Sequence, residues 1–230
     1  MIVLGSATIG YFASETVFKD ALSPDRCRWC DSNRIDRAAR DGLLWADPGK
    51  ARAASTVVGY VAVPIVVFGA LAVSGLRDPA GPVRLVDDAI PVLEALLYTQ
   101  LVTNAFKYTF ARERPSVHFA AEPGTRSNED NLSFISGHSS LTFAIAVGAG
   151  TVAHRRKTRY EPFVWGAGLA LASATAYLRI AGDRHYLTDV LAGGAVGAAG
   201  GLVIPRLTGS LPSGVSIVPA HNGVSLAGSF

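Results

Sequence analysis

A chain of 230 residues is long enough for one domain with a full apolar core. Its net charge is only +3, and no basic run has interleaved aromatic residues, which argues against a nucleic acid partner. Hydrophobic residues make up 49% of the chain and charged residues 17%, a balance that excludes neither a soluble nor a membrane protein.

The N-terminal segment, residues 1–54, is mixed in character. Its first ten residues are mildly apolar but lack a basic region and a clear cleavage site, so they do not predict a complete signal peptide. Either the start of the protein is missing, or a later helix directs the chain to its compartment. Residues 15–54 are charged and mixed, and helical periodicity is present around residues 35–44.

Cys27 and Cys30 are the two cysteines of the chain. A redox-active Cys-x-x-Cys motif is expected beside a βαβ pattern, which the flanking sequence lacks, and a zinc site needs two further ligands at matching spacing. We therefore predict a short structural disulfide in an oxidising compartment, with free thiols as the alternative.

Five helical stretches follow. The first contains no charge and is long enough to cross a bilayer, whereas the second, after a turn at residues 77–84, carries three acidic residues. A polar loop at residues 112–131 precedes three helices rich in Ala and Gly, which suits close packing but lowers hydropathy. The expected helices are residues 55–76, 86–110, 138–153, 162–180 and 186–204.

The sequence thus predicts an all-α fold, a bundle of about five to six helices whose main domain covers residues 55–206. Membrane-spanning and soluble exported versions both stay open. In the tail, residues 207–230, two alternating stretches at 215–220 and 224–230 flank Asn222-Gly223, a strong hairpin-turn signal. We predict a small β-hairpin there, and a frayed tail is the alternative.

The first group of chemically active residues is Lys107 with Arg114 and Pro115. Lys107 and Arg114 are seven residues apart, so on one helix they lie on one face, and Pro115 favours a helix end at that point. Two cations at a helix end suit a phosphate group. Basic residues beside an apolar helix are more often interfacial anchors, so this group alone decides nothing.

The second group is Ser136-Gly137-His138, at the start of an apolar helix. Ser136 is a natural N-cap, and the backbone N–H groups of Gly137 and His138 form an anion site where the helix dipole is positive. His138 is placed to donate a proton there. A lone histidine at a helix start is more often a cap or a surface residue.

The third group is Arg179, His185 and Asp189. His185 and Asp189 are four residues apart, hence on one helix face and within hydrogen-bonding reach. Such an aspartate fixes the imidazole tautomer and stabilises its cation. For a single His–Asp pair, a structural hydrogen bond is the simpler explanation.

Together, the three groups resemble the signature of the type 2 phosphatidic acid phosphatase and vanadium haloperoxidase superfamily: Lys-x6-Arg-Pro, then Ser-Gly-His, then Arg-x5-His-x3-Asp. The resemblance covers residues 107–189 closely and the flanking helices more loosely. Two positions differ, since Ile135 stands where the family usually has Pro and Leu178 where it usually has Ser. These changes bear on the shape of one loop and on one hydrogen bond.

The resemblance implies a phosphatase, a phosphoric monoester hydrolase, that needs no metal and no cofactor. His185 would attack phosphorus, Asp189 would accept the proton of the other ring nitrogen, and His138 would protonate the leaving oxygen. The surrounding cations take the place of metal ions and should lower the pKa of His185. The implied phosphate-binding groups are Lys107, Arg114, Arg179, the amide of Gly137 and the hydroxyl of Ser136.

The substrate class implied is a lipid phosphate or a polyprenyl diphosphate, and the latter would make the enzyme an acid anhydride hydrolase. A vanadate-dependent haloperoxidase, with His185 as the vanadate ligand, is the alternative reaction class, although such members tend to be larger soluble proteins. A non-catalytic envelope protein would be expected to lose motif charges, and this chain keeps them.

The strongest basic run, residues 154–159, lies between the helices that carry the second and third groups, so it must face away from the site. If the helices span a membrane, the positive-inside rule places this run in the cytoplasm. The catalytic face then looks toward the periplasm or exterior, together with Cys27 and Cys30. We therefore predict a cell-envelope protein with a membrane as its partner.

Overall fold

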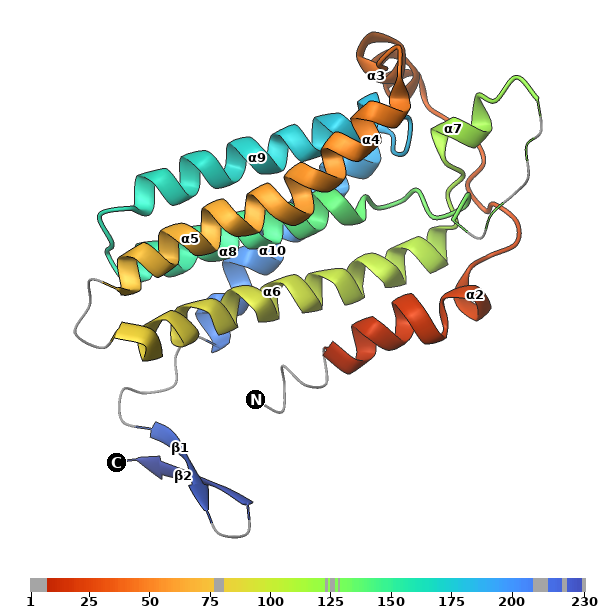
Figure 1. The fold of residues 1–230 in the computed structure, drawn as a ribbon. Coiled ribbons are helices and arrows are strands. Elements are labelled where there is room, and N and C mark those ends of the chain that lie inside the picture. Colours follow the sequence, from red (N-terminus) through yellow and green to blue (C-terminus); the bar gives the residue numbers. More distant parts are fainter. Residues whose placement is uncertain are drawn as a thin grey trace.

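The computed structural model describes residues 8–76, 81–122, 124, 127, 129–208, 215–220 and 223–228. Within these ranges, long helices lie side by side in one bundle, as the sequence predicts (Figure 1). The first is continuous from α4 (Pro48–Val57) through a π-helical turn, η2 (Val58–Ala62), into α5 (Val63–Gly75). The others are α6 (Gly81–Phe110), α8 (Gly137–Arg155), α9 (Glu161–Ala181) and α10 (Leu187–Thr208).

Helix α8 is the centre of the bundle, and most of its residues are buried. Helix α10 approaches it through glycines: a Cβ added at Gly193 would lie 2.6 Å from the carbonyl oxygen of Ser136, and one at Gly201 would lie 2.6 Å from the amide nitrogen of Gly148. Only a residue without a side chain fits such contacts. The Gly-rich composition of α10 is therefore what brings its first turn against the start of α8.

Three helices in the described ranges are long and apolar enough to cross a membrane: Pro48–Gly75, Glu161–Ala181 and Leu187–Thr208. Large apolar side chains also point outward from these helices, as membrane lipid favours, among them Val57, Ile65, Phe163, Leu191 and Val203. Helix length and outer surface thus both support membrane association.

Two boundaries differ from the sequence prediction. Helix α6 begins at Gly81 rather than near residue 86, so the second half of the predicted turn is helical, and residues 77–80 lie outside the described ranges. The polar loop contains a short helix, α7 (Pro115–His118), which starts at the proline because proline suits the first turn of a helix.

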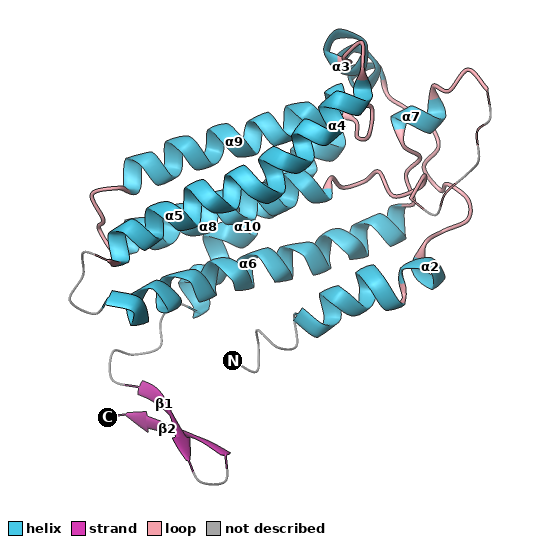
Figure 2. Cartoon of the chain, viewed as in Figure 1, coloured by secondary structure: helices cyan, strands magenta, loops and turns pink. Residues whose placement is uncertain are grey.

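The N-terminal segment forms short helices: η1 (Ala13–Val17), α2 (Lys19–Leu22) and α3 (Arg34–Leu43). Helix α3 confirms the predicted periodicity, and the Asn33 side chain caps it by accepting a hydrogen bond from the Asp36 amide. The predicted hairpin is also present, as β1 (Val215–Ala220) antiparallel to β2 (Gly223–Gly228) (Figure 2). Residues 221–222 and 229–230 of that prediction lie outside the described residues.

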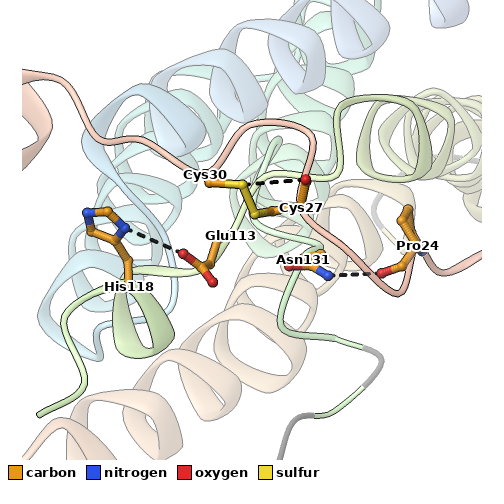
Figure 3. The surroundings of a disulfide bond; sticks show 6 residues. All are labelled: Pro24, Cys27, Cys30, Glu113, His118 and Asn131. Atoms are coloured by element: carbon orange, nitrogen blue, oxygen red, sulfur yellow. Dashed lines mark hydrogen bonds and ion pairs between the residues drawn. A yellow bond between two sulfur atoms is a disulfide. The ribbon is translucent and has the colours of Figure 1, made fainter. Parts of the chain in front are cut away.

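Cys27 and Cys30 form the predicted disulfide (Figure 3). The loop they close lies along the chain that leaves α6, because the Arg28 amide donates to the Ala111 carbonyl and the Glu113 amide to the Trp29 carbonyl. The loop therefore sits at the end of the bundle where α6 and α9 finish and α8 begins (Figure 1).

Candidate active site

The three groups of predicted residues meet at this end of the bundle, around a cavity of about 350 Å³. Helix α6 supplies its last turns, α8 its first turn, and α9 its last turn together with the loop toward α10. Segments far apart in the sequence thus converge, as the resemblance requires. The predicted residues that line the cavity are Lys107, Arg114, Gly137, His138, Arg179 and His185.

His185 lies in the loop between α9 and α10 and is only 3% exposed. Its Nδ1 lies 2.8 Å from the carbonyl oxygen of Ser133, which can only accept, so Nδ1 carries the proton. The lone pair is then on Nε2, which faces an Arg114 nitrogen at 3.4 Å. The ring is thereby prepared as a nucleophile or base at Nε2.

The environment of His185 favours its neutral form. Burial is the main cause that lowers its pKa well below the ordinary value, and the positive charges of Arg114, Arg179 and Lys107 add to the effect. The hydrogen bond to the Ser133 carbonyl opposes it. The direction agrees with the prediction that surrounding cations lower this pKa.

The predicted hydrogen bond between His185 and Asp189 is wrong in this structure. Asp189 Oδ2 lies 3.8 Å from Nδ1, too far for a hydrogen bond, and the Ser133 carbonyl takes that place. The carboxylate of Asp189 instead accepts from the Ser133 hydroxyl at 2.6 Å and from the Tyr186 amide at 2.9 Å. A spacing of four residues gives reach on a helix, but His185 precedes the first turn of α10, so its ring is aimed from a loop.

Arg114 reaches the cavity by a route that differs from the prediction. Helix α6 ends at Phe110, and Arg114 has extended backbone just before α7, so it does not share a helix face with Lys107. Its Nε donates to the Glu129 carbonyl at 2.7 Å, which fixes the guanidinium in the cavity wall. Burial, together with Arg184 and Arg179, lowers the pKa of Arg114 to about 9.

The other two predicted cations also face the cavity. Arg179 donates to the hydroxyl of Ser55 at 3.1 Å. Lys107 lies against the start of α8, because a Cβ added at Gly137 would come within 3.1 Å of its Nζ. Gly137 therefore leaves room for an ammonium group beside a helix N-terminus, a pairing that suits an anion.

At the start of α8, Ser136 and His138 have different roles. Ser136 caps the helix as predicted, its hydroxyl oxygen accepting from the Ser139 amide, but it is fully buried and does not line the cavity. The predicted contact between this hydroxyl and a phosphate is therefore not offered by this structure. His138 lies edge-on to Tyr60 at 4.7 Å between ring centroids, and its Nε2 has no hydrogen-bond partner within the described part of the chain.

Several cavity residues were missed by sequence reasoning. Arg184 directly precedes His185 in the sequence, and this adjacency was the one sequence signal that could have identified it as a cavity residue. The others come from segments without a recognisable motif, and three belong to the N-terminal segment. The missed lining residues are Tyr11, Glu15, Arg52, Tyr60, Gln100, Asn104, Glu129 and Arg184.

Glu129 balances the cations at the rim of the cavity. It accepts from Lys19 at 2.9 Å and from Arg184 at 2.9 Å. The Lys19 hydrogen bond is the main cause that lowers the pKa of Glu129 to about 2, so the side chain is a carboxylate. In the part of the chain that the structure describes, no three His, Cys, Asp or Glu side chains gather as metal ligands.

The geometry agrees with comparisons to known proteins. The family model described as the PAP2 superfamily matches residues 88–211. A lipid A 1-phosphatase of Porphyromonas gingivalis is 38% identical over 96 residues, which are 42% of this chain and 18% of that protein. The chain thus spans less than a fifth of that relative's length.

Two solved structures share the fold. One is the transmembrane PAP2 type phosphatidylglycerolphosphate phosphatase of Bacillus subtilis, with a TM-score of 0.56 and 17% identity over 93% of this chain and 99% of that one. The other is LpxE of Aquifex aeolicus, with a TM-score of 0.52 and 17% identity over 76% of this chain and 97% of that one.

Proposed function

This chain belongs to the PAP2 superfamily, and from that premise we propose that it is a metal-independent phosphatase that hydrolyses lipid phosphates through a phospho-histidine intermediate on His185. The observation that carries the proposal is the His185 ring itself. It presents an unprotonated Nε2 to a buried cavity beside the Arg114 guanidinium. A nucleophile surrounded by fixed cations suits attack on a phosphate ester.

The reaction proceeds in two steps. The Nε2 lone pair attacks phosphorus, an N–P bond forms, and the P–O bond to the alcohol breaks. Burial, with the nearby arginines and Lys107, lowers the pKa of His138 to about 3 before substrate binds. The negative charge of the bound phosphate opposes this shift, and His138 then donates a proton to the leaving oxygen. Water then attacks phosphorus, His138 takes up its proton, and the N–P bond breaks to release inorganic phosphate.

The cations of the cavity bind the phosphoryl oxygens during both steps. Arg114 and Arg179 offer forked donors, and Lys107 lies beside the free amides at the start of α8. The two arginines are positioned before substrate arrives, because the surrounding chain already holds each guanidinium. Charge that develops on the phosphoryl group is therefore stabilised without reorganisation.

A lipid substrate is supported by the fold and by the relatives. The cavity lies at one end of a bundle whose outer helices are apolar enough to span a membrane. The relatives named above act, by their names, on lipid A and on phosphatidylglycerolphosphate. The basic run at residues 154–159 lies at the opposite end of the bundle (Figure 1), so the positive-inside rule turns the cavity toward the periplasm or exterior.

Phosphate release from a lipid panel tests the function. We expect the purified protein in detergent and excess EDTA to release phosphate from at least one of phosphatidic acid, phosphatidylglycerol phosphate and a polyprenyl diphosphate. A bromination assay with added vanadate tests the haloperoxidase alternative in parallel. Absence of phosphate release from every lipid would overturn the proposal, and bromination in its place would favour the haloperoxidase.

Labelling with a membrane-impermeant thiol reagent tests the orientation. In a background with both native cysteines replaced by serine, Glu122→Cys lies on the cavity end and Arg159→Cys in the basic run. Intact cells should label the first and spare the second, and the reverse pattern would contradict the outward-facing cavity.

A further inference from the structure

Arg112 is a fully buried arginine next to the cavity that belongs to none of the three motif groups. Its guanidinium joins two carboxylates from distant parts of the chain, Asp36 of α3 at 2.6 Å and Asp189 of α10. All three side chains are 0% exposed. Arg112 does not line the cavity, so it acts on a phosphate only through its neighbours.

The guanidinium is also clamped from both sides. It stacks on the ring of Trp29, with Cζ 3.9 Å from the ring centroid, and on the ring of Tyr186 at 4.0 Å. Trp29 lies between the two cysteines of the disulfide, and its backbone pairs with that of Arg112. A charge held on two faces and at two ends has little freedom to move.

Asp36 anchors the far end of this cluster. Besides Arg112, its carboxylate accepts from the Thr188 amide at 2.9 Å, the Thr188 hydroxyl at 2.8 Å and the Asn33 side chain at 2.7 Å. The N-terminal segment is thus tied to the first turn of α10, next to Asp189.

At its other end, the cluster contacts Ser133, which holds the His185 imidazole. Asp189 accepts from the Ser133 hydroxyl, and the Ser133 amide donates to the Arg112 carbonyl at 3.0 Å. Ser133 in turn presents its carbonyl to Nδ1 of His185. Arg112 therefore holds Ser133 from two sides, and Ser133 sets the tautomer and tilt of the ring.

We propose that Arg112, anchored by Asp36, is a positioning residue: it keeps Asp189 off the imidazole so that His185 Nδ1 stays on the Ser133 carbonyl and Nε2 points into the cavity. Without the guanidinium, the buried carboxylate would lose its cation and keep the Ser133 hydroxyl and the Tyr186 amide as donors. Nδ1 of His185, 3.8 Å away, would then be a further donor within a short shift. A shift toward that donor would turn the ring. The inference rests on the proposed function, because its readout is turnover at His185.

The test compares Arg112→Gln with Arg156→Gln in the detergent-purified full chain. Arg156 pairs with the buried Asp88 at 2.7 Å at the opposite end of the bundle, so its loss removes an arginine that pairs with a buried carboxylate far from the cavity. We expect Arg112→Gln to lower kcat between about 10- and 100-fold, as for other groups that orient a catalytic side chain. KM and the inhibition constant of inorganic phosphate should stay near the wild-type values, because the cavity cations remain. The control should keep the wild-type kcat.

Two further variants separate positioning from folding. Arg112→Lys restores the charge without the fork and should recover part of the lost kcat. Asp36→Asn should lower kcat less, and the double variant with Arg112→Gln should be no worse than Arg112→Gln alone, because both residues act through one cluster.

Three results would overturn this role: an unchanged kcat in Arg112→Gln, an equal fall in Arg156→Gln, or a phosphate inhibition constant that rises as much as kcat falls. Wild-type protein that releases no phosphate from any lipid would instead overturn the proposed function, and this role with it.

Discussion

The cavity is built by two regions that contribute in different ways. Residues 107–189 supply the imidazoles and the three predicted cations, and they do so through short spacings that are visible in the sequence. The N-terminal segment, residues 8–54, supplies part of the wall and the supports behind it, through partners more than 70 positions away. Reactive groups are thus encoded locally, whereas the bracing that aims them is encoded by long-range contacts.

The N-terminal segment supports the site at three places. Arg40 of α3 binds the carboxylate of Asp183 at 2.6 and 2.9 Å, in the loop that carries the imidazole, where Asp183 has a positive φ of 56°. Lys19 binds Glu129 at the cavity rim. Asp36 reaches α10 through Arg112 and Thr188. Loss of a residue in this region should therefore weaken the geometry of the reaction before it weakens phosphate binding.

Removing the imidazole of His185 should have the largest effect on turnover. His185→Ala should lower turnover by at least about 10⁴-fold, the scale seen when the nucleophile is removed from a set of catalytic residues that act together. The matched control is His118→Ala, since His118 lies outside the cavity and should leave phosphate release unchanged. Substantial hydrolysis by purified His185→Ala protein would count against the nucleophile assignment.

The protonation state of His185 tests the chemical environment that residues 107–189 create around its imidazole. Only a neutral imidazole reacts with diethyl pyrocarbonate, and burial with nearby cations lowers the pKa of His185. As pH falls, the modification rate at His185 should therefore drop at a clearly lower pH than that of N-acetylhistidine, whose pKa is about 6.5. Peptide mass spectrometry measures the site, with His185→Ala as control. A drop at the same pH as for N-acetylhistidine would contradict the cationic environment.

Removing the disulfide tests how the N-terminal segment supports the site, and here we expect the smallest change in kcat. Its loop is short, so the double variant Cys27→Ser/Cys30→Ser should lose at most about 2 kcal/mol of unfolding free energy. Because Trp29 stacks on Arg112, kcat should also fall, but less than in Arg112→Gln. Reductant should reproduce this fall in the wild type and do nothing in the double variant. A wild-type kcat in the double variant would show that the loop does not support Arg112.

Sequence reasoning recovered the bundle and most of the candidate residues that line the cavity, because both depend on local pattern. Apolar runs located the long helices, and the spacing of His138, Arg179 and His185 located the cavity. It failed where a tertiary contact replaced the local rule. The His185–Asp189 spacing predicted a hydrogen bond that the Ser133 carbonyl makes instead.

Other features left no pattern to find. Arg114 reaches the cavity from extended backbone, because α6 stops at Phe110. Asp36 and Arg112 looked like ordinary charges in polar stretches, and only the folded chain brings them together, fully buried. The N-terminal contribution to the cavity could not be foreseen, because side chains such as Tyr11 and Arg52 meet the motif residues only through the packing of the bundle.

The central claim is that the imidazole of His185 becomes covalently phosphorylated. Rapid acid-free quenching of the enzyme with ³²P-labelled phosphatidic acid, or with whichever lipid of the panel is hydrolysed, tests it directly. We predict a burst of protein-bound label that is stable in alkali, labile in acid and mapped to His185 by peptide mass spectrometry. Steady hydrolysis of the same lipid with no labelled histidine, or with the label on another residue, would contradict the account.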